Sequence, residues 1–411
     1  MTELNWAGNV AYRAARVHRP GSVDELRAIV AAAPRIRALG TRHAFSDMGD
    51  SAELVATSGL PRVVEPDRAA GTVTVSAGLT YGELAIALDG LALHNLASLP
   101  HISVAGAIAT ATHGSGDRNG NLTTAVTALE LVTADGSLLT VARGDEDFAG
   151  MVVGLGALGV VTRVTLAAEP PFDARQRVFE RLRWDALLEH FDAITAAGDS
   201  VSVFTLWGDD AGDVWVKTRA TEAPEEMRRD LFGAAAAAVE HHPIPGLDPV
   251  NCTPQLGVPG PWYDRLPHFR MGFTPSSGEE IQSEYFVARA DAAAALRALR
   301  AVSDRIRPVL QVSEIRTQAA DELWLSPQYR QDTVSLHFTW RRDPAAVELA
   351  LSAVEAALEP FGARPHWGKA FLQAPGGRYE RLGDFAALAG RLDARGAFRN
   401  AWTDAILATA T

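Results

Sequence analysis

Charged and hydroxyl side chains stand at alternate positions in two runs of the second half of the chain. Glu314 and Arg316 are two residues apart, and His337 and Thr339 repeat this spacing. Side chains two apart on a strand point to the same face of a sheet. Such a row can hydrogen-bond a ligand with several hydroxyl groups and can reject ligands that lack one of them. A solvated sheet face with a cross-strand ion pair has the same pattern, so these residues alone leave both interpretations open.

A run of small residues from position 94 to position 116 has the composition of an anion-binding segment. Gly, Ala, Ser and Thr dominate it, so the backbone can approach a ligand closely and donate hydrogen bonds without a formal charge. A pyrophosphate and the edge of a planar cofactor ring are suitable ligands. A packed turn would also explain the small side chains, but it would not explain the hydroxyl groups.

Two single polar residues stand in loops that would hold them in place. His43 follows an apolar strand expected at 35–39, and Lys369 ends the Pro- and Gly-containing loop 364–369. A loop anchored on a rigid strand is a suitable place for a group that takes part in chemistry. The ordinary alternatives are a loop histidine without a partner and a surface lysine.

Hydrophobic periodicity and turn residues predict the elements that must position these side chains. A capping box at Ser22–Glu25 opens a helix, and Asp135-Gly136 predicts a hairpin between strands at 125–133 and 138–142. Further elements of the first half are expected as strands at 54–56, 62–64, 72–75 and 160–166, and as helices at 81–88 and 145–153.

Beyond residue 171 the pattern changes to helices that alternate with short strands. It predicts an antiparallel sheet flanked by helices, and hence an α+β fold. The helices are expected at 184–197, 291–306 and 345–358, and the strands at 202–206, 214–218, 283–287, 309–317 and 333–340. An alanine tract at 233–239 predicts one more helix, with His241 and His242 at its C-terminal end rather than in a metal site.

The run Gly154–Gly159 matches the dinucleotide fingerprint Gly-x-Gly-x-x-Gly letter for letter. That fingerprint requires a strand before it and a helix after it, so that a pyrophosphate meets a helix N-terminus. Here a helical pattern comes first and the strand at 160–166 follows. We therefore interpret the run as a helix-to-strand turn and reject a Rossmann-type NAD site.

The composition is that of a soluble globular protein with two domains. The chain has 411 residues, of which 47% are apolar and 21% charged. Its net charge of −12 argues against a nucleic-acid partner, and no apolar run is long enough to span a bilayer. The single cysteine, Cys252, excludes an internal disulfide and fits a reducing compartment. No signal peptide is visible, so a cytoplasmic location is expected.

Taken together, the motifs resemble those of a known family. They occur along the chain in the order found in the alditol oxidases, relatives of the aldonolactone oxidases among the vanillyl-alcohol-oxidase type of FAD enzymes. The resemblance extends from Trp6 to Asn400. The motifs are Gly40-Thr41-Arg42-His43, the segment His94–Gly116, Glu314-Ile315-Arg316-Thr317, His337-Phe338-Thr339-Trp340 and His366-Trp367-Gly368-Lys369.

The resemblance implies a fold and a cofactor. The fold would have a PCMH-type FAD-binding domain at 1–172 with a C-terminal return at 365–411, and a substrate (cap) domain at 173–364. FAD would be linked covalently through His43 to the 8α-methyl carbon of the flavin. The family usually has Gly before this histidine and Ser after it, where this chain has Arg42 and Ala44. The implied cofactor-binding residues are Gly40, Thr41, Arg42, His43, Ala44, Phe45, Ala97, Ser98, Ser103, Gly106, Ala107, Ile108, Ala109, Thr112, His113, Gly114 and Val161.

The resemblance also implies a reaction. A flavoprotein oxidoreductase of this kind oxidises the terminal primary alcohol of an alditol, such as xylitol or sorbitol, to the aldose. Hydride passes from C1 to flavin N5, and O2 is reduced to hydrogen peroxide. Arg316, Lys369, His337 and Glu314 would be catalytic. Substrate would be bound by Ser98, Glu314, Arg316, His337, Thr339 and Lys369.

Other functions compete with this interpretation. The nearest alternative is a sugar-1,4-lactone oxidase or dehydrogenase of the same fold, and a more distant one is a sugar-binding protein without redox chemistry. The expected partners are a small polyol and O2. Nucleic acid, a membrane, a metal and an obligate protein partner are not expected, and a monomer fits these expectations.

Overall fold

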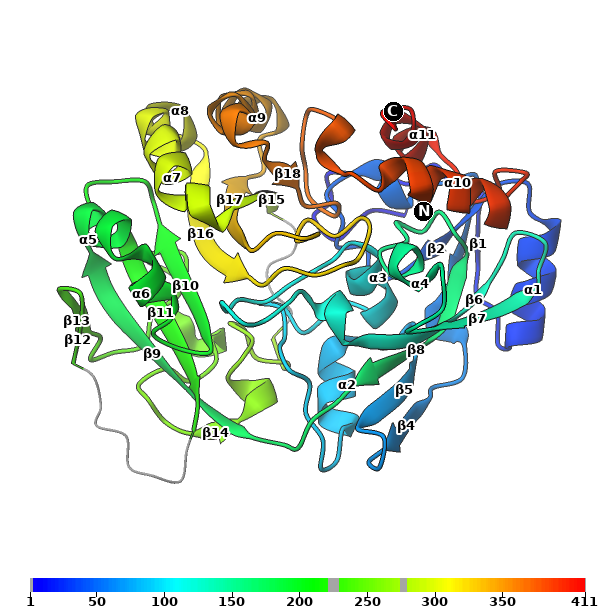
Figure 1. Ribbon diagram of the computed structural model, residues 1–411, viewed down its shortest axis with the longest axis horizontal. Helices are drawn as coiled ribbons and strands as arrows, with labels where there is room; N and C mark the ends of the chain where they lie inside the picture. Colours follow the sequence, from blue (N-terminus) through cyan, green and yellow to red (C-terminus); the bar gives the residue numbers. More distant parts are fainter. Residues whose placement is uncertain (1–2, 221–228, 274–278, 411) are drawn as a thin grey trace.

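The computed structural model describes residues 3–220, 229–273 and 279–410 of the chain. Figure 1 shows two halves side by side: strands β1–β8 form one half, and the large sheet with helices α5–α9 forms the other. The two halves are joined where β8 (Val160–Ala167) leads into β9 (Asp173–Leu182). The candidate site residues come from both halves, so their arrangement depends on how the halves pack.

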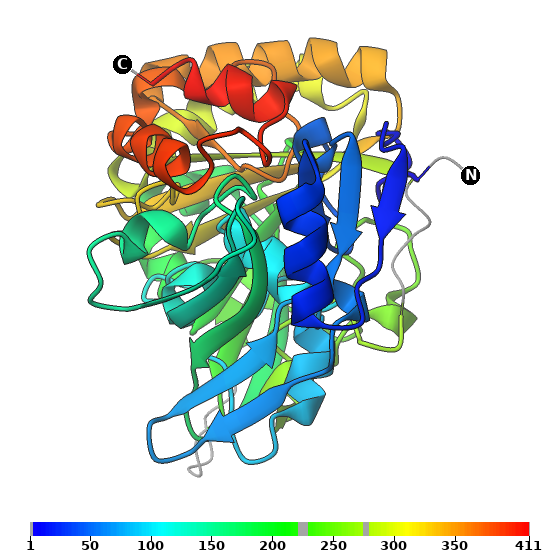
Figure 2. The ribbon, with the colours of Figure 1, turned by 90° about the vertical axis from the view of Figure 1, so that its right-hand side faces the viewer.

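A small parallel sheet carries the loop that holds His43. Its strand order is β1 (Arg16–His18), β3 (Glu53–Ala56) and β2 (Ile36–Leu39). Helix α1 (Val23–Ala32) lies beside it, as Figure 2 shows. The Ser22 hydroxyl accepts a hydrogen bond from the Glu25 amide at the start of α1, as the capping box predicts.

A five-stranded antiparallel sheet carries the small-residue segment. Its order is β4 (Val64–Asp67), β5 (Thr72–Ser76), β8, β6 (Val126–Val132) and β7 (Leu138–Ala142). Helices α2 (Tyr81–Ala87), α3 (Val104–Ala109) and α4 (Phe148–Met151) accompany it. Apolar side chains of α2, α3, β6 and β8 form one core, which also includes residues of the C-terminal helix α10 (Leu382–Leu392).

A ten-stranded sheet, antiparallel in all its described pairings, forms the second half. Its order is β12 (Asp230–Leu231), β13 (Ala234–Ala236), β9, β11 (Gly212–Arg219), β10 (Ser200–Thr205), β16 (Leu310–Gln318), β17 (Thr333–Arg341), β15 (Glu280–Ala288) and β18 (Arg364–Pro365), while β14 (Gly260–Pro261) pairs with β9. The accompanying helices are α5 (Trp184–Glu189), α6 (Phe191–Thr195), α7 (Ala292–Ala301), α8 (Ser303–Ile306) and α9 (Pro344–Leu358).

Alternation along β17 decides which face of this sheet is apolar. Leu336, Phe338 and Trp340 point into the core between the sheet and its helices, and the Trp340 indole donates a hydrogen bond to the Ser283 hydroxyl (2.9 Å). Side chains of successive strand residues point to opposite faces. The polar residues between them therefore face away from the helices.

The C-terminal segment returns to the first half. Helices α10 and α11 (Ala401–Leu407) lie above that half in Figure 1. The Ile36 amide donates to the carbonyl oxygen of Ala397 (2.8 Å), and Asn400 donates to the backbone of the segment that follows His43, at Asp47, Met48 and Asp50. The end of the chain thus fixes the strand and the loop that position His43.

Most expected elements are present, but several predictions are wrong in type or in extent. The alanine tract at 233–239 contains the short strand β13, paired with β12 and β9, rather than a helix. Tertiary pairing overrides helix propensity there, so His241 and His242 do not stand at a helix end. The strand expected at 62–64 instead begins at Val64, and the helix expected at 145–153 is a single turn. β9 was not expected at all.

The division into domains at 172/173 and 364/365 stays a prediction, and its outer ends at residues 1 and 411 lie outside the described residues. Among the residues that the structure does describe, no helix combines the length and apolar character needed to cross a membrane.

Candidate active site

One cavity of about 720 Å³ joins the two halves of the molecule. The His43 loop, helix α3 and the turn Gly154–Gly159 line one part of it, and the polar face of β15, β16 and β17 lines another. Ligand pockets typically measure several hundred Å³ and combine an apolar lining with a few convergent polar groups. The cavity therefore has the size and lining for a cofactor with a small substrate beside it.

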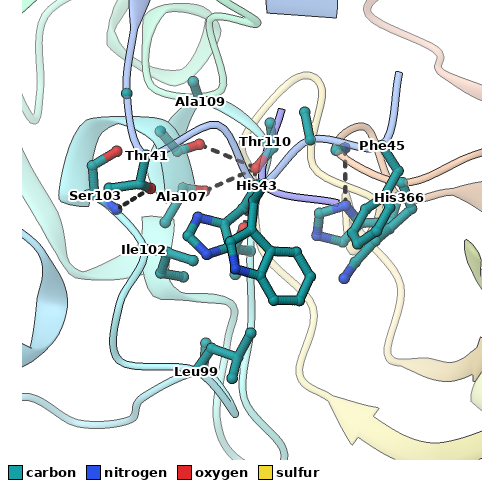
Figure 3. Close-up of a pocket in the computed structure, with 18 of the residues that line it drawn as sticks. Thr41, His43, Phe45, Leu99, Ile102, Ser103, Ala107, Ala109, Thr110 and His366 are labelled. Atoms are coloured by element: carbon teal, nitrogen blue, oxygen red, sulfur yellow. Dashed lines mark hydrogen bonds between the residues drawn. The ribbon is translucent and has the colours of Figure 1, made fainter. Parts of the chain in front are cut away.

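The loop after β2 is tied to the start of α3. The Ser103 amide donates to the Thr41 hydroxyl (3.0 Å), a bond that Figure 3 shows beside His43. A methyl group added at Gly40 would come 2.6 Å from the Ser103 hydroxyl oxygen, and one added at Gly106 would come 2.7 Å from it. These two glycines let the loop and the helix approach closely at the cavity wall.

His43 is held as a neutral ring with one free nitrogen. Its imidazole stacks on the Trp6 indole, with ring centroids 5.3 Å apart and planes 23° from parallel. Burial, together with the nearby cation Lys369, lowers the pKa of His43 to about 4. Nδ1 is buried and has no hydrogen-bond partner. A neutral imidazole with a partnerless nitrogen is suited to form a bond to carbon, because its lone pair is available.

Arg42 explains why glycine is usual at its position in the loop. Its backbone adopts a left-handed conformation with φ +63°, which costs a non-glycine residue roughly 1–2 kcal/mol. The guanidinium compensates in part by pairing with the Glu3 carboxylate (2.6 Å), and the Arg42 carbonyl accepts from the Trp6 amide (2.8 Å). The departure at Arg42 thus adds backbone strain to the loop, which the contacts of Arg42 offset in part.

Strand register brings the predicted polar residues into rows across three strands. Glu314 on β16 lies opposite His337 on β17, and His337 lies opposite Glu284 on β15. In the next row Thr339 lies opposite Gln282. Both predicted pairs line the cavity, and the four side chains are buried there rather than solvated. The structure therefore contradicts the alternative of a solvated sheet face.

Arg316 lies between two buried carboxylates. Its guanidinium donates to Glu284 Oε1 (2.7 Å) and lies 3.5 Å from Glu314 Oε2. Burial alone would raise the pKa of each carboxyl. The Arg316 charge and the histidine hydrogen bonds outweigh burial: His113 and Arg316 hold the pKa of Glu284 well below its usual range, and Arg316 with the hydrogen bond from His268 lowers that of Glu314. Both carboxylates are therefore ionised hydrogen-bond acceptors.

Lys369 and His337 share one partner, the side chain of Gln282. The Lys369 ammonium and His337 Nε2 (3.2 Å) both donate to Gln282 Oε1, and the Gln282 amide donates to Glu280. Burial lowers the pKa of His337 to about 3 and that of Lys369 to about 8. His337 is thus neutral and donates from Nε2, which leaves Nδ1 as its only possible proton acceptor.

His113, Glu284 and His366 place side-chain nitrogen and oxygen atoms within 4.8 Å of one another. His113 Nδ1 donates to the Gly114 carbonyl (2.8 Å) and Nε2 faces Glu284 Oε1 (3.2 Å). His366 Nδ1 accepts from the Gly368 amide (3.0 Å), so the neutral ring carries its proton on Nε2. Neither ring has a free lone pair, so hydrogen bonds account for the cluster and no metal is assigned.

The structure brings the predicted site residues together with one exception. All the predicted cofactor- and substrate-binding residues except Gly114 line the cavity. Gly114 lies behind it, where its carbonyl accepts from His113 and Gln318 Nε2 (3.4 Å) and an added methyl group would collide with the Leu96 carbonyl at 2.4 Å.

Sequence reasoning missed a set of polar residues on β15 and in distant loops. The polar–apolar–polar run Glu280–Gln282 is a strand signal, but the strand expected at 283–287 began too late to include it. The glycine-rich turn 154–159 was correctly interpreted as a turn, but it also lines the cavity. The missed lining residues include Trp6, His268, Glu280, Gln282, Glu284 and His366.

Comparison with known proteins gives two matching families. A family model described as an FAD binding domain matches residues 14–142, and one described as D-arabinono-1,4-lactone oxidase matches residues 277–406. The chain is 48% identical over 406 residues to alditol oxidase from Streptomyces sp. (strain IKD472), with 96% of each chain covered. It is 30% identical to L-gulono-1,4-lactone dehydrogenase from Mycobacterium tuberculosis, with 98% of each chain covered.

Solved structures agree on the fold. Cholesterol oxidase from B. sterolicum matches with a TM-score of 0.77 at 16% sequence identity, covering 99% of this chain and 96% of that one. A solvent-stable cholesterol oxidase gives a TM-score of 0.78 at 16% identity, covering 99% and 97%. The predicted α+β fold with a PCMH-type FAD-binding domain is confirmed.

The residues of the cavity fit FAD, the cofactor that the first family model implies. His43 offers a partnerless buried nitrogen, and Gly40 and Gly106 leave room that a side chain would fill. The lining of the His43 side is mostly backbone and small or apolar side chains, which suits a planar ring. The chain is therefore an FAD-binding oxidoreductase whose charged side chains are concentrated on the opposite wall of the same cavity.

Proposed function

The chain belongs to the alditol oxidase family, which is related to the aldonolactone oxidases, and from this premise we propose that it oxidises the terminal primary alcohol of an alditol to the aldose. Xylitol and sorbitol are the expected substrates, and O2 is reduced to hydrogen peroxide. The observation that carries the proposal is the single cavity lined by both the His43 loop and the polar face of the large sheet. FAD, when bound, supplies the acceptor for the two electrons of the alcohol.

Arg316 and Lys369 bind and polarise the C1 hydroxyl in this proposal. Both are cations held in a buried site, where an electrostatic interaction with a developing alkoxide is stronger than in water. The Glu284 and Glu314 carboxylates fix the plane of the Arg316 guanidinium, and Gln282 fixes the position of the Lys369 ammonium. Neither cation has to reorganise when the substrate arrives.

The remaining hydroxyls of the polyol meet Ser98, Glu314, His337 and Thr339. These groups include donors and acceptors, as a chain of hydroxyls requires. A ligand without a matching hydroxyl would leave buried polar groups unpaired, which costs binding energy. If His337 accepts the alcohol proton, it does so at Nδ1, because Nε2 already donates to Gln282.

An oxidase assay separates this proposal from the lactone alternative, which the match to the D-arabinono-1,4-lactone oxidase model supports. We expect xylitol to give hydrogen peroxide with a kcat/KM at least about tenfold above that for L-gulono-1,4-lactone, because a row of polar residues favours the open-chain polyol. The measurement is peroxide release at equal protein concentration. A higher kcat/KM for the lactone would establish the alternative, and a colourless protein that turns over neither would indicate sugar binding without redox chemistry.

We further propose that FAD is attached covalently through His43. The neutral ring and its partnerless Nδ1 support this assignment. Acid-precipitated wild-type protein should give a yellow pellet, whereas His43→Ala should release all the flavin into the supernatant. His101→Ala changes a histidine near His43 and serves as the matched control, since its pellet should stay yellow. Peptide mass mapping that found residue 43 unmodified in fully active enzyme would contradict the linkage.

A further inference from the structure

Lys217 lies behind the substrate-facing wall of the cavity, where removing a charged ammonium from water costs free energy. The chain contains two lysines: Lys369 faces the cavity, and Lys217 on β11 is 1% exposed. The Lys217 ammonium donates to the carbonyl oxygens of Leu266 and Pro267 (3.1 Å) and lies 3.1 Å from Nδ1 of His268. These three acceptors match the three N–H groups of an ammonium, so the buried charge is fully hydrogen-bonded.

The neighbours of His268 determine which ring nitrogen carries its proton. An ammonium can only donate, so Nδ1 of His268 must accept from Lys217. The Glu314 carboxylate can only accept, so Nε2, at 2.9 Å from Glu314 Oε1, must donate. Burial, reinforced by the Lys217 charge, lowers the pKa of His268 to about 4 and keeps the ring neutral. Lys217 therefore selects the tautomer that can hold Glu314.

His268 also connects two parts of the proposed substrate site. Its backbone amide donates to the carbonyl of Ser98 (3.1 Å), so one residue contacts both Ser98 and Glu314. Its ring packs edge-on against Phe204 and Trp215, with centroids 5.2 and 5.4 Å away. The ring is thus prevented from turning by packing as well as by hydrogen bonds.

We propose that Lys217 and His268 are positioning residues for the polyol: Lys217 fixes the Nε2–H tautomer of His268, and His268 orients the Glu314 carboxylate toward a substrate hydroxyl. The inference rests on the proposed function, since Glu314 matters here as a substrate-binding group. One oxygen of Glu314 is held by His268 and the other lies near Arg316. Without the His268 donor, the carboxylate would be oriented from one side only.

The tautomer can be tested without any turnover. In the flavin-loaded wild-type enzyme labelled with ¹⁵N-histidine, the ring signals of His268 are those lost in His268→Gln. We expect these signals to show a protonated Nε2 and an unprotonated Nδ1 at about pH 6, where Lys217, whose pKa burial lowers to about 7, is mainly an ammonium. Lys217→Met should shift the proton toward Nδ1. A protonated Nδ1 in the wild type would overturn the inference, whatever the substrate.

The functional consequence is tested by a double-mutant cycle on xylitol oxidation. Lys217→Met should raise KM about tenfold and change kcat less than about threefold, because in the proposed function Glu314 binds a substrate hydroxyl other than the one on C1. His268→Gln places an amide donor near the position of Nε2 without needing a tautomer, so its KM should stay near that of the wild type. Adding Lys217→Met to His268→Gln should then have little further effect.

An equal rise in KM from Lys217→Met in both backgrounds would show that Lys217 has only a structural role, and would overturn the inference. If Lys217→Met does not fold, Lys217→Gln, which keeps N–H donors for His268 Nδ1, should leave KM near that of the wild type. His268→Met, which has no donor, should raise KM like Lys217→Met. Wild-type enzyme that does not oxidise xylitol would instead refute the proposed function, and the NMR result would still decide the tautomer.

Discussion

Replacing Arg316 with methionine should abolish nearly all polyol oxidation and also destabilise the protein. The change removes the cation that lies between Glu284 and Glu314 and leaves two ionised carboxylates in a buried site. Removing one partner of a buried ion pair costs about 3–5 kcal/mol of unfolding free energy. Loss of a preorganised charge at the reacting group costs about 10²–10³ in kcat. Urea unfolding and xylitol turnover measure the two effects.

The pH dependence of the Arg316→Met defect follows from the two carboxylates. In the wild type their folded pKa values lie below the usual range, so they contribute stability above the unfolded pKa of about 4.3 and lose it only as the pH falls through the folded values. When Arg316 is removed, burial raises the pKa values of both carboxyl groups. Protonation of a carboxylate then relieves its unpaired charge. The stability deficit should therefore be larger at pH 7 than near pH 5.

Two further variants show whether the loss is specific to the buried site. Arg183→Met removes an exposed arginine paired with Asp185, and it should change the unfolding free energy by less than about 1 kcal/mol. Arg316→Lys keeps the charge but loses the planar fork, so it should recover part of the stability and little of the activity. An Arg316→Met enzyme with wild-type turnover would remove Arg316 from the proposed catalytic groups.

Changing Lys369 should have the second largest effect on turnover, and its pH profile identifies the active form of the amine. Burial lowers the pKa of Lys369 to about 8, so the ammonium is lost as the pH rises through about 8. If the ammonium polarises the C1 hydroxyl, kcat should fall above that pH. Lys369→Met should lower kcat by about 10²–10³ below pH 8, where the wild-type ammonium is present, and by less above it. Absorbance should show that the variant still binds the flavin.

Lys369→Arg is the matched variant for this profile. A guanidinium stays charged throughout the accessible range, so the fall in kcat above pH 8 should disappear while the plateau stays below that of the wild type. The opposite wild-type profile, with kcat rising through pH 8, would show that the neutral amine acts as the proton acceptor. Unfolding curves at each pH keep loss of structure separate from loss of activity.

Features that depend on neighbouring residues in the chain were predictable. The alternation in β16 and β17 placed Glu314, Arg316, His337 and Thr339 on one face, as the structure confirms. The capping residue Ser22 and the turn at Asp135-Gly136 were also identified correctly. Capping, turn chemistry and strand alternation are set within a few residues, so they can be recognised without knowing what lies across the fold.

The network around Arg316 was not predictable, because its members come from segments far apart in sequence. Glu284 approaches Arg316 because β15 and β16 both pair with β17, which brings the two strands into one sheet. His113 reaches Glu284 from the other half of the molecule. The alanine tract shows the same effect, since pairing with β9 overrides its helix propensity.

The sequence by itself determined the family, the order of the cofactor and substrate segments, and the faces on which the polar side chains stand. Only the tertiary structure decided that the polar face of the large sheet is a buried cavity wall rather than a solvated surface. It also decided that Lys217 hydrogen-bonds His268, which in turn hydrogen-bonds Glu314. Burial and cross-strand neighbours depend on how distant segments pack. Those same factors set the protonation of the charged groups, so the chemistry of the site is a property of the fold rather than of any motif.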